Sequence, residues 1–155
     1  MPKLVKGGKY VFGWVVVGDN GEIPIPGEAA AEYGMNSPED LIAIEGSQTS
    51  GGFGVSRKDT LCRSPLGVIL ERYGELETGR EGEPILVEGR SKIYARVPLD
   101  RNGRILFTAG ILRAYGIKPG DKILALRGSS LALAFAVRGP IVEEAADHPE
   151  LEVFR

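Results

Sequence analysis

The residues of this sequence best suited to chemistry are cations gathered in its second half. Positions 84–137 hold nine Lys or Arg and only three Asp or Glu, a net charge of +6. Several cations spread over one surface are what proteins use to follow the phosphates of nucleic acid. The candidates for DNA contact are Arg96, Arg101, Arg104, Arg113, Lys118 and Lys122, and Arg127 belongs to the same basic set.

A second candidate is the segment Ser47-Gln48-Thr49-Ser50-Gly51-Gly52-Phe53-Gly54. Hydroxyl groups and glycine N–H groups in one loop can form a nest for an anion or a small ligand. The segment lacks P-loop spacing, because no Gly-Lys-Ser/Thr follows it. The residues proposed for such a ligand loop are Ser47, Ser50, Gly51 and Gly52.

The residue types of nucleophilic catalysis and of metal binding are scarce. Cys62 is the only cysteine, which excludes an intrachain disulfide and a thiolate metal cage. His148 is the only histidine, so Cys/His and Ser/His/Asp schemes lack a visible set of partners. We therefore expect a protein that is not an enzyme and that uses no cofactor and no metal.

The sequence also matches itself after a shift of 82 positions. Fifteen of the 54 positions aligned without a gap, 2–55 with 84–137, are identical. A fixed internal period predicts two copies of one structural unit. The clearest identities are Asn20-Gly21 with Asn102-Gly103, Tyr33-Gly34 with Tyr115-Gly116, Gly46-Ser47 with Gly128-Ser129, and Phe53 with Phe135.

Both copies predict the same order of elements. Apolar, β-branched runs indicate a first strand at 10–17 and at 93–99. Asn-Gly follows and favours a hairpin turn, because both residues tolerate positive φ. A short strand, 23–25 or 105–107, and a helix of about two turns come next, with Thr108 as an N-cap and Gly34 or Gly116 beyond the last turn. Further strands are predicted at 40–44, 122–126, 53–55 and 131–137.

The duplication continues beyond these strands in a shifted register. Positions 63–66 match 138–141 once seven residues, 56–62, are treated as an insertion. Pro65 and Pro140 suit the first position of a helix, so each copy is expected to add one helix, near 64–74 and 139–147. The polar, Gly-rich stretch 78–83 indicates a linker. The chain thus divides into a first repeat, 2–77, a linker, 78–83, and a second repeat with a C-terminal helix, 84–155.

This order of elements resembles the AbrB/SpoVT/MazE family of swapped-hairpin domains. The resemblance is carried by Asn20 to Gly34 in the first copy and by Asn102 to Ile123, with Lys118-Pro119-Gly120-Asp121, in the second. In that family two chains interlock their hairpins, since a unit of about 50 residues cannot bury an adequate core. The resemblance implies a mainly β fold with short helices, in which both repeats interlock into one pseudo-twofold β-barrel.

The resemblance also implies a function, because this family is chiefly known for DNA binding by transcription regulators and antitoxins. Arg104 and Arg113 match commonly basic family positions, and Arg101 in the turn is an added candidate. The first copy is acidic instead, with three Lys and seven Asp or Glu. We therefore expect an AbrB/SpoVT-like transcriptional regulator that binds DNA mainly through its second repeat. The first copy places Glu22, Ala31 and Asp19 at the matching positions.

Other interpretations of these residues stay open. The cations of the second copy can pair with carboxylates of the first copy or of another subunit, or can form an ordinary solvated surface. The segment 47–54 can be a β-turn with a bulge, because its counterpart 129–135 closes without glycine. The alternative function is a small-ligand or protein-binding module on the same fused barrel, with DNA binding lost. The acidic candidates for internal pairing are Asp19, Glu22, Glu28, Glu32 and Glu39.

The sequence also sets expectations about location. No apolar run approaches the roughly 18 residues that span a bilayer, and positions 1–8 lack the apolar core of a signal peptide. We expect a cytoplasmic protein without a membrane partner. Besides DNA, a second copy of the chain is a candidate partner, as a homo-oligomer.

Overall fold

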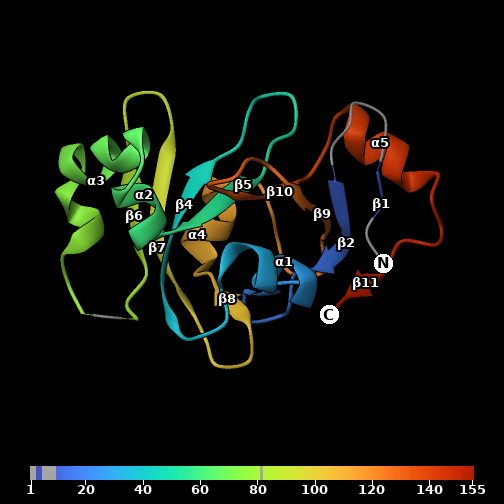
Figure 1. The fold of residues 1–155 in the computed structure, drawn as a ribbon, viewed down its shortest axis with the longest axis horizontal. Helices are drawn as coiled ribbons and strands as arrows, with labels where there is room; N and C mark the ends of the chain where they lie inside the picture. Colours follow the sequence, from blue (N-terminus) through green and yellow to red (C-terminus); the bar gives the residue numbers. More distant parts are fainter. Residues whose placement is uncertain (1–2, 5–9, 81) are drawn as a thin grey trace.

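One curved sheet dominates the fold. The computed structural model describes residues 3–4, 10–80 and 82–155. Eleven strands form a sheet that curls into a nearly closed barrel, with short helices around it (Figure 1). The mainly β class predicted from the sequence is confirmed. Within the described ranges, no helix has the length and apolar character needed to cross a membrane.

The first half follows the predicted order of elements. Gly21, in the Asn-Gly turn, has φ of +84°, and Gly34 ends the helix in the left-handed conformation with φ of +70°. A β-carbon disfavours both conformations, which is why glycine stands there. The elements are β1 (Lys3–Leu4), β2 (Tyr10–Val16), β3 (Glu22–Pro24), α1 (Gly27–Tyr33), β4 (Glu39–Glu45) and β5 (Phe53–Arg57). The rest of the predicted match between 2–7 and 84–89 falls on residues outside the described ranges.

The second half repeats this order. The hydroxyl of Thr108 accepts a hydrogen bond of 3.2 Å from the N–H of Ile111, which confirms the predicted N-cap. Gly116, with φ of +73°, follows the last turn of the helix. The elements are β6 (Ile85–Glu88), β7 (Ile93–Leu99), β8 (Arg104–Leu106), α4 (Ala109–Ala114), β9 (Lys122–Arg127) and β10 (Leu133–Ala136).

The long strands of each half pair with those of the other half. Strand β2 lies antiparallel to β9, and β7 lies antiparallel to β4. The halves also meet where β5 pairs with β10, with Phe53 opposite Phe135, and where β3 pairs with β8, with Ile23 opposite Ile105. The order is β1-β2-β9-β10-β5-β4-β7-β8-β3, so the halves alternate along the sheet. Five of the ten strand pairings among the described residues therefore join one half to the other.

The two late hairpins differ in register. Arg127 lies opposite Leu133, so the loop between β9 and β10 spans residues 128–132. Glu45 lies opposite Phe53, so the loop between β4 and β5 spans 46–52 and is two residues longer. The ungapped sequence alignment pairs position 45 with 127 and position 53 with 135. The strand pairing instead places Leu133, two residues before Phe135, opposite Arg127. The longer loop rises from one end of the barrel in Figure 1, away from the β7–β8 turn at the other end.

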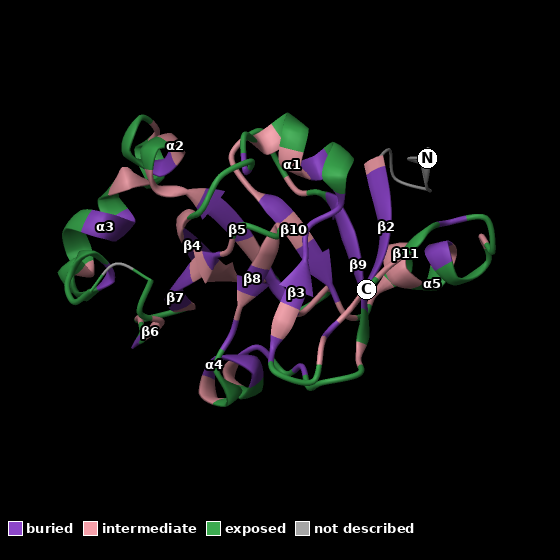
Figure 2. Ribbon diagram, turned by 90° about the horizontal axis from the view of Figure 1, so that it is seen from below, coloured by how far each residue is buried: buried purple, intermediate pink, exposed green. Residues whose placement is uncertain are grey.

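Two groups of short elements cover the outer face of the sheet on opposite sides of the barrel (Figure 2). The first packs Leu61 and Ile69 against Ile42 of β4 and Tyr94 of β7. The second packs Ala145 against Trp14 of β2 and its neighbours on β9. The first group is α2 (Lys58–Cys62), the 3₁₀ helix η1 (Pro65–Gly67), α3 (Val68–Arg72) and the 3₁₀ helix η2 (Gly74–Glu77); the second is α5 (Pro140–Ala146) and β11 (Val153–Phe154).

These groups correct part of the prediction. The helix expected near 64–74 starts at Pro65 as a 3₁₀ turn and continues as α3 to Arg72, and Tyr73, with φ of −117° and ψ of 68°, interrupts it before η2. The seven residues treated as an insertion form the end of β5 and all of α2. The helix expected near 139–147 is present as α5, and Pro140 occupies its first turn as predicted.

Aromatic side chains fill the barrel where the halves meet. The ring of Phe53 stacks on that of Phe135 at a centroid distance of 4.8 Å and on that of Tyr115 at 5.5 Å. Phe107 lies 4.8 Å from Phe53 at a tilt of 50°. All four residues are buried. Burial raises the pKa of the Tyr115 phenol, whose hydroxyl donates to the carbonyl of Ile93 at 3.1 Å.

Separation of the halves tests this dependence. We expect fragments 1–77 and 78–155 each to lack a cooperative thermal transition, because β2 and β4 of the first lose their partners β9 and β7. An equimolar mixture is expected to recover the circular dichroism spectrum and the melting transition of the intact chain, which serves as the control. Cooperative unfolding of fragment 1–77 as a monomer would contradict the prediction.

Candidate nucleic-acid interface

The hairpin turns of the two halves lie at the end of the barrel opposite the 46–52 loop; we call this the turn end and define it by residues 18–21 and 100–103. The N–H of Ile25 donates to the carbonyl of Gly103 at 2.9 Å. The N–H of Phe107 donates to the carbonyl of Gly21 at 3.0 Å. Ile25 leads into α1 and Phe107 leads into α4. The turn of each half is therefore held beside the helix of the other half.

Two of the predicted cations come together beside α4. Arg113 of α4 and Lys118 of the following turn line a pocket of about 370 Å³ with Asp19 and Asn20 from the first half. The ammonium of Lys118 also contacts Asp121 Oδ1 at 3.0 Å. Both cations are exposed. The crossing of the halves thus places a carboxylate of the acidic copy at the basic helix.

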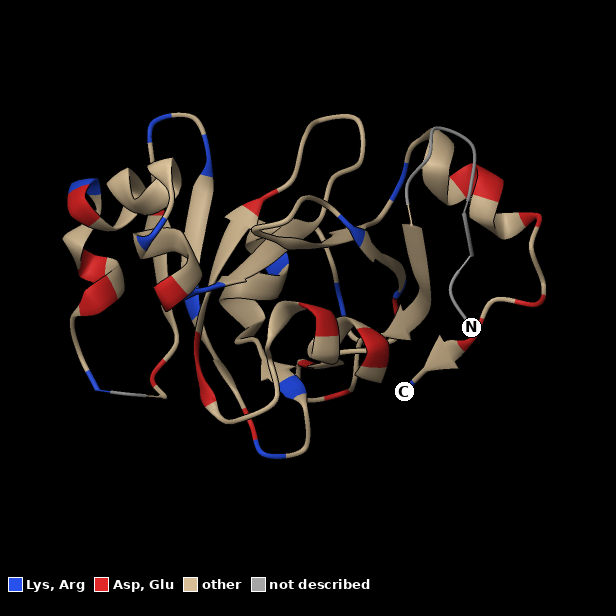
Figure 3. Ribbon diagram, viewed as in Figure 1, with Lys and Arg blue, Asp and Glu red and all other residues tan. Residues whose placement is uncertain are grey.

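Two other predicted cations lie on the β7–β8 turn. Arg101 is exposed at the tip of this turn. Arg104 is half-buried, and its guanidinium donates to the carbonyl of Arg155 at 3.2 Å. The carboxylate of Asp100 shapes the turn by accepting from the N–H of Asn102 at 2.8 Å and from that of Arg104 at 3.0 Å. Figure 3 shows acidic and basic segments intermixed around this end of the barrel.

Arg96 is placed differently from the prediction. Its side chain is 3% exposed and lies on the outer face of β7, beneath the residues that join the two halves. Its guanidinium donates to the carbonyls of Leu76, at 3.2 Å, and of Thr78. It also donates to the carbonyls of Arg80 and Glu83, each at 3.1 Å. Arg96 is therefore a structural residue whose Nη donors are taken by backbone carbonyls, and it is not accessible to a phosphate.

The carboxylate of Asp40 is the charged partner of Arg96. Asp40 Oδ2 lies 3.8 Å from Arg96 Nε, and this buried nitrogen has no hydrogen-bond partner within the described residues. Asp40 also accepts from the N–H of Gly82, at 3.1 and 3.2 Å. The pair joins a carboxylate of the first half to a cation of the second. Internal pairing, one of the readings left open by the sequence, holds at this position.

Lys122 also stands apart from the turn end. Its ammonium lies 4.9 Å from the centroid of the Trp14 ring, a cation–π contact. Both residues line a pocket beneath the C-terminal residues, with His148 and Leu151. Lys122 therefore belongs to the side of the barrel covered by α5, away from Arg113.

Arg127 forms a second ion pair between the halves. Its Nε and Nη2 each lie 2.6 Å from a carboxylate oxygen of Glu32, and this bidentate contact lowers the pKa of Glu32. The guanidinium also covers the ring of Tyr10 at 4.4 Å. The Tyr10 hydroxyl donates to Glu28 at 2.5 Å, which raises the pKa of Tyr10 to about 12. Glu32 thus pairs internally, as the sequence left open.

The predicted ligand loop is a tightly bonded loop. The Ser47 hydroxyl lies 3.0 Å from that of Ser50 and accepts from the Ser50 N–H at 3.2 Å. The N–H of Gly51 donates to the carbonyl of Ser47 at 2.8 Å, and that of Gly46 donates to Gly52 at 3.0 Å. These N–H groups point at acceptors of the loop itself, so they do not form a free anion nest. The glycines make the turn instead, with φ of +63° and +65° at Gly51 and Gly52.

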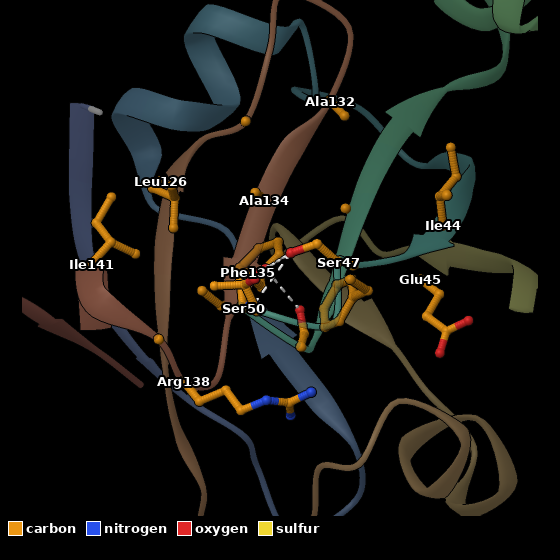
Figure 4. A pocket seen from close by; sticks show the side chains of 18 of the residues that line it. Ile44, Glu45, Ser47, Ser50, Leu126, Ala132, Ala134, Phe135, Arg138 and Ile141 are labelled. Carbon is orange, nitrogen blue, oxygen red and sulfur yellow. Dashed lines mark hydrogen bonds between the residues drawn. The ribbon is translucent and has the colours of Figure 1, made fainter. Parts of the chain in front are cut away.

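The loop nevertheless forms one wall of a cavity of about 590 Å³. Ser47, Ser50 and Gly51 line it together with apolar residues of β4, β5, β9 and β10 (Figure 4). Arg138, which the sequence did not single out, lies at its edge and donates to the carbonyl of Gln48 at 3.2 and 2.9 Å. Small residues at alternate positions of β5 and β10, such as Gly54 and Ala134, are a sequence signal that could have indicated an open outer face here.

Comparison with known proteins supplies no further constraint on this site. Searches against protein-family models, curated proteins and solved structures returned no match. The geometry of the chain itself carries the functional argument.

The buried position of Arg96 gives a stability prediction. We expect Arg96→Ala to lower the free energy of unfolding by about 3–5 kcal/mol, because four carbonyls and Asp40 lose their partner in a buried site. Urea unfolding followed by circular dichroism measures the change. Arg101→Ala removes the same side chain from an exposed turn and is expected to change the value by no more than about 0.5 kcal/mol. Equal effects of the two substitutions would contradict a structural role for Arg96.

Proposed function

We propose that the chain is a tandem pair of AbrB-like swapped hairpins interlocked within one polypeptide. The reciprocal pairing of strands supports this arrangement. Val15 lies opposite Ile123, and Val97 lies opposite Leu41, which is the same pair after the 82-residue shift. In the pairs Phe53–Phe135 and Ile23–Ile105, each residue lies opposite its own counterpart in the other repeat, 82 positions away. A twofold relation between the halves requires both properties.

We propose further that the protein binds DNA through the turn end, as the resemblance to transcription regulators implies. The observation that carries this proposal is the exposure of Arg101, Arg113 and Lys118, with Arg104 half-buried between the turns. These cations stand on the β7–β8 turn, on α4 and just after α4. The same elements contact the duplex in the family that the sequence resembles.

The surroundings of these cations set the strength of binding. Asp19 lies beside Arg113 and Lys118, and Asp121 pairs with Lys118. Four cations that each neutralise one phosphate give a slope of about −3 to −4 in a plot of log K against log salt. Because carboxylates reduce the local potential, we propose binding that is strong only at low salt and that depends on the second repeat.

A small-ligand module with DNA binding lost is the second candidate function. The cavity beside the 46–52 loop favours it, because its volume of about 590 Å³ and its apolar lining are typical of small-molecule sites. This cavity and the turn end lie at opposite ends of the barrel, so the two functions are separable by experiment.

The DNA proposal is tested by fluorescence anisotropy with a random duplex at two salt concentrations. We expect Arg101→Ala, Arg104→Ala and Arg113→Ala, combined, to make the salt slope shallower by about 3 and to weaken binding strongly at the lower salt concentration. The matched control replaces Arg63, Arg72 and Arg90, which are exposed elsewhere, by Ala and keeps the slope. Absence of binding by the unmodified protein at low salt, or equal slopes for both triple variants, would reject DNA binding.

Removal of the Asp19 carboxylate is predicted to raise DNA affinity, whereas removal of the cations lowers it. Asp19→Asn removes a negative charge beside Arg113 and Lys118, so we expect tighter DNA binding. A unit charge a few ångströms away in water is worth about 1 kcal/mol, which corresponds to roughly fivefold. The same anisotropy assay measures the gain, with Asp147→Asn after α5 as the control of equal charge. An unchanged or weakened affinity for Asp19→Asn would show that DNA does not approach this pocket.

A further inference from the structure

Among the residues that the structure describes, helices cover only part of the outer face of the two central strands, since Ala136 of β10 packs with Ala145 of α5. The inner side chains of β5 and β10, such as Phe53 and Leu133, fill the barrel. Their outer positions hold Gly54 and Ala134, which lie opposite each other. One group of short helices covers β4 and β7, and α5 covers β2 and β9. A trough with a floor of small residues therefore runs between two covered regions.

This trough is the cavity of about 590 Å³ noted above. Ile44 of β4 forms one side, and Leu126 of β9 with Ile141 of α5 forms the other (Figure 4). Ala132 and Ala134 lie on the floor between them. Binding sites for small molecules typically have volumes of about 300–1,000 Å³ and mostly apolar linings with a few polar groups. The size and the lining of this cavity match such a site.

The wall of the cavity is fixed before any ligand arrives. The carbonyl of Ser50 accepts from the N–H of Val137 at 2.9 Å and from that of Arg138 at 3.1 Å. The Arg138 side chain holds the carbonyl of Gln48 from the same side. These bonds tie the 46–52 loop to the segment that enters α5. A preformed wall lowers the entropy lost when a ligand binds.

The edge of the cavity carries positive charge. Arg138 uses Nε and Nη2 for the Gln48 carbonyl, and Lys92 donates to the carbonyl of Glu45 at 2.9 Å. Both bonds are to neutral carbonyls, and neither cation forms an ion pair within 4 Å among the residues that the structure describes. The one carboxylate at the edge, that of Glu45, accepts from the N–H of Ile93 at 3.0 Å. Two cations against one carboxylate favour an anionic group at this edge.

We propose that this cavity binds a small amphipathic anion, with an apolar body on the floor of β5 and β10 and an acidic group at Arg138 and Lys92. The hydroxyls of Ser47 and Ser50 supply further hydrogen bonds at the wall. The 46–52 loop, which forms its wall, lies at the end of the barrel away from the β7–β8 turn (Figure 1). The ligand proposal is separate from DNA binding and can be tested without it.

Two probes measure occupancy in the full-length protein. Titration with 8-anilinonaphthalene-1-sulfonate, an apolar aromatic anion, is expected to give saturable fluorescence with one site per chain. Decanoate is expected to displace the dye at micromolar concentration, whereas decanol, which has the same chain without the charge, displaces it at least tenfold less well. Equal displacement by acid and alcohol would overturn the assignment of an anionic group.

Variants locate the site. We expect Ala134→Leu to fill the floor and abolish dye binding, and Arg138→Gln to weaken decanoate binding about tenfold without affecting decanol. Ala146→Leu and Arg72→Gln are the matched controls, and thermal melts confirm that each variant is folded. Dye binding that survives both cavity variants would place the probe elsewhere and reject the site.

Light scattering after gel filtration tests the other occupant, a second copy of the chain. If a partner subunit covered the trough, the protein would run as a dimer, the dye would not bind, and Ala134→Leu would produce monomers. That set of results would overturn the ligand proposal. A monomer that binds the dye, or a dimer whose dye binding is lost in Ala134→Leu without a change in mass, supports it. Dye binding in a protein that does not bind DNA would support the ligand proposal and reject only the DNA proposal.

Discussion

Strand pairing between the halves is the interaction on which everything else in this structure depends. Strand β9 supplies the partner of β2, and β4 supplies the partner of β7. The stacked rings of Phe53 and Phe135 lie where the central strands meet. A half of fewer than 80 residues would leave long strand edges and half of an aromatic cluster in water. The outer helices have no surface to pack against until this pairing is made.

The same pairing decides where charge is found. Along the sequence the acidic copy and the basic copy are separate blocks, with net charges of −4 over 2–55 and +6 over 84–137. In space each turn lies beside the helix of the opposite half, so Asp19 lines the same pocket as Arg113 and Lys118. Glu32 meets Arg127, and Asp40 meets Arg96. Charge segregation in a sequence becomes charge mixing on a surface when the segments are interlocked.

The predictable parts of the fold are those set by local chemistry. Asn-Gly at 20–21 and 102–103, the Thr108 cap and Gly34 each act within a few residues, so the sequence indicates their turns and helix ends correctly. The register of the β4–β5 hairpin was not predictable from the repeat, because a longer loop shifts one strand by two residues without changing its apolar pattern. The helix near 64–74 begins at Pro65 as predicted and ends at Arg72, because the backbone of Tyr73 leaves the helical conformation.

The candidate sites divide in the same way. Arg101, Arg113 and Lys118 are exposed on the elements where the pattern placed them. Arg96 occupies the position that holds Trp14 in the first copy, and it is buried because the preceding segment, with carbonyls at 76, 78, 80 and 83, folds over it. The cavity is formed by a loop of one half and the helix entry of the other. The burial of Arg96 and the cavity both arise from contacts between different segments of the chain. The sequence pattern of one segment therefore cannot predict either of them.

The contacts of Arg96 also change what the joint between the repeats can tolerate. Polar, Gly-rich joints usually accept inserted or deleted residues, because they run freely over the surface. Here one guanidinium holds carbonyls at positions 76, 78, 80 and 83, so the spacing of these residues is fixed by the reach of a single side chain. A change of length in this segment would detach part of that set. The segment between the repeats must therefore keep its number of residues to keep all of its hydrogen bonds to Arg96. Its polar, Gly-rich composition alone would suggest a linker of variable length.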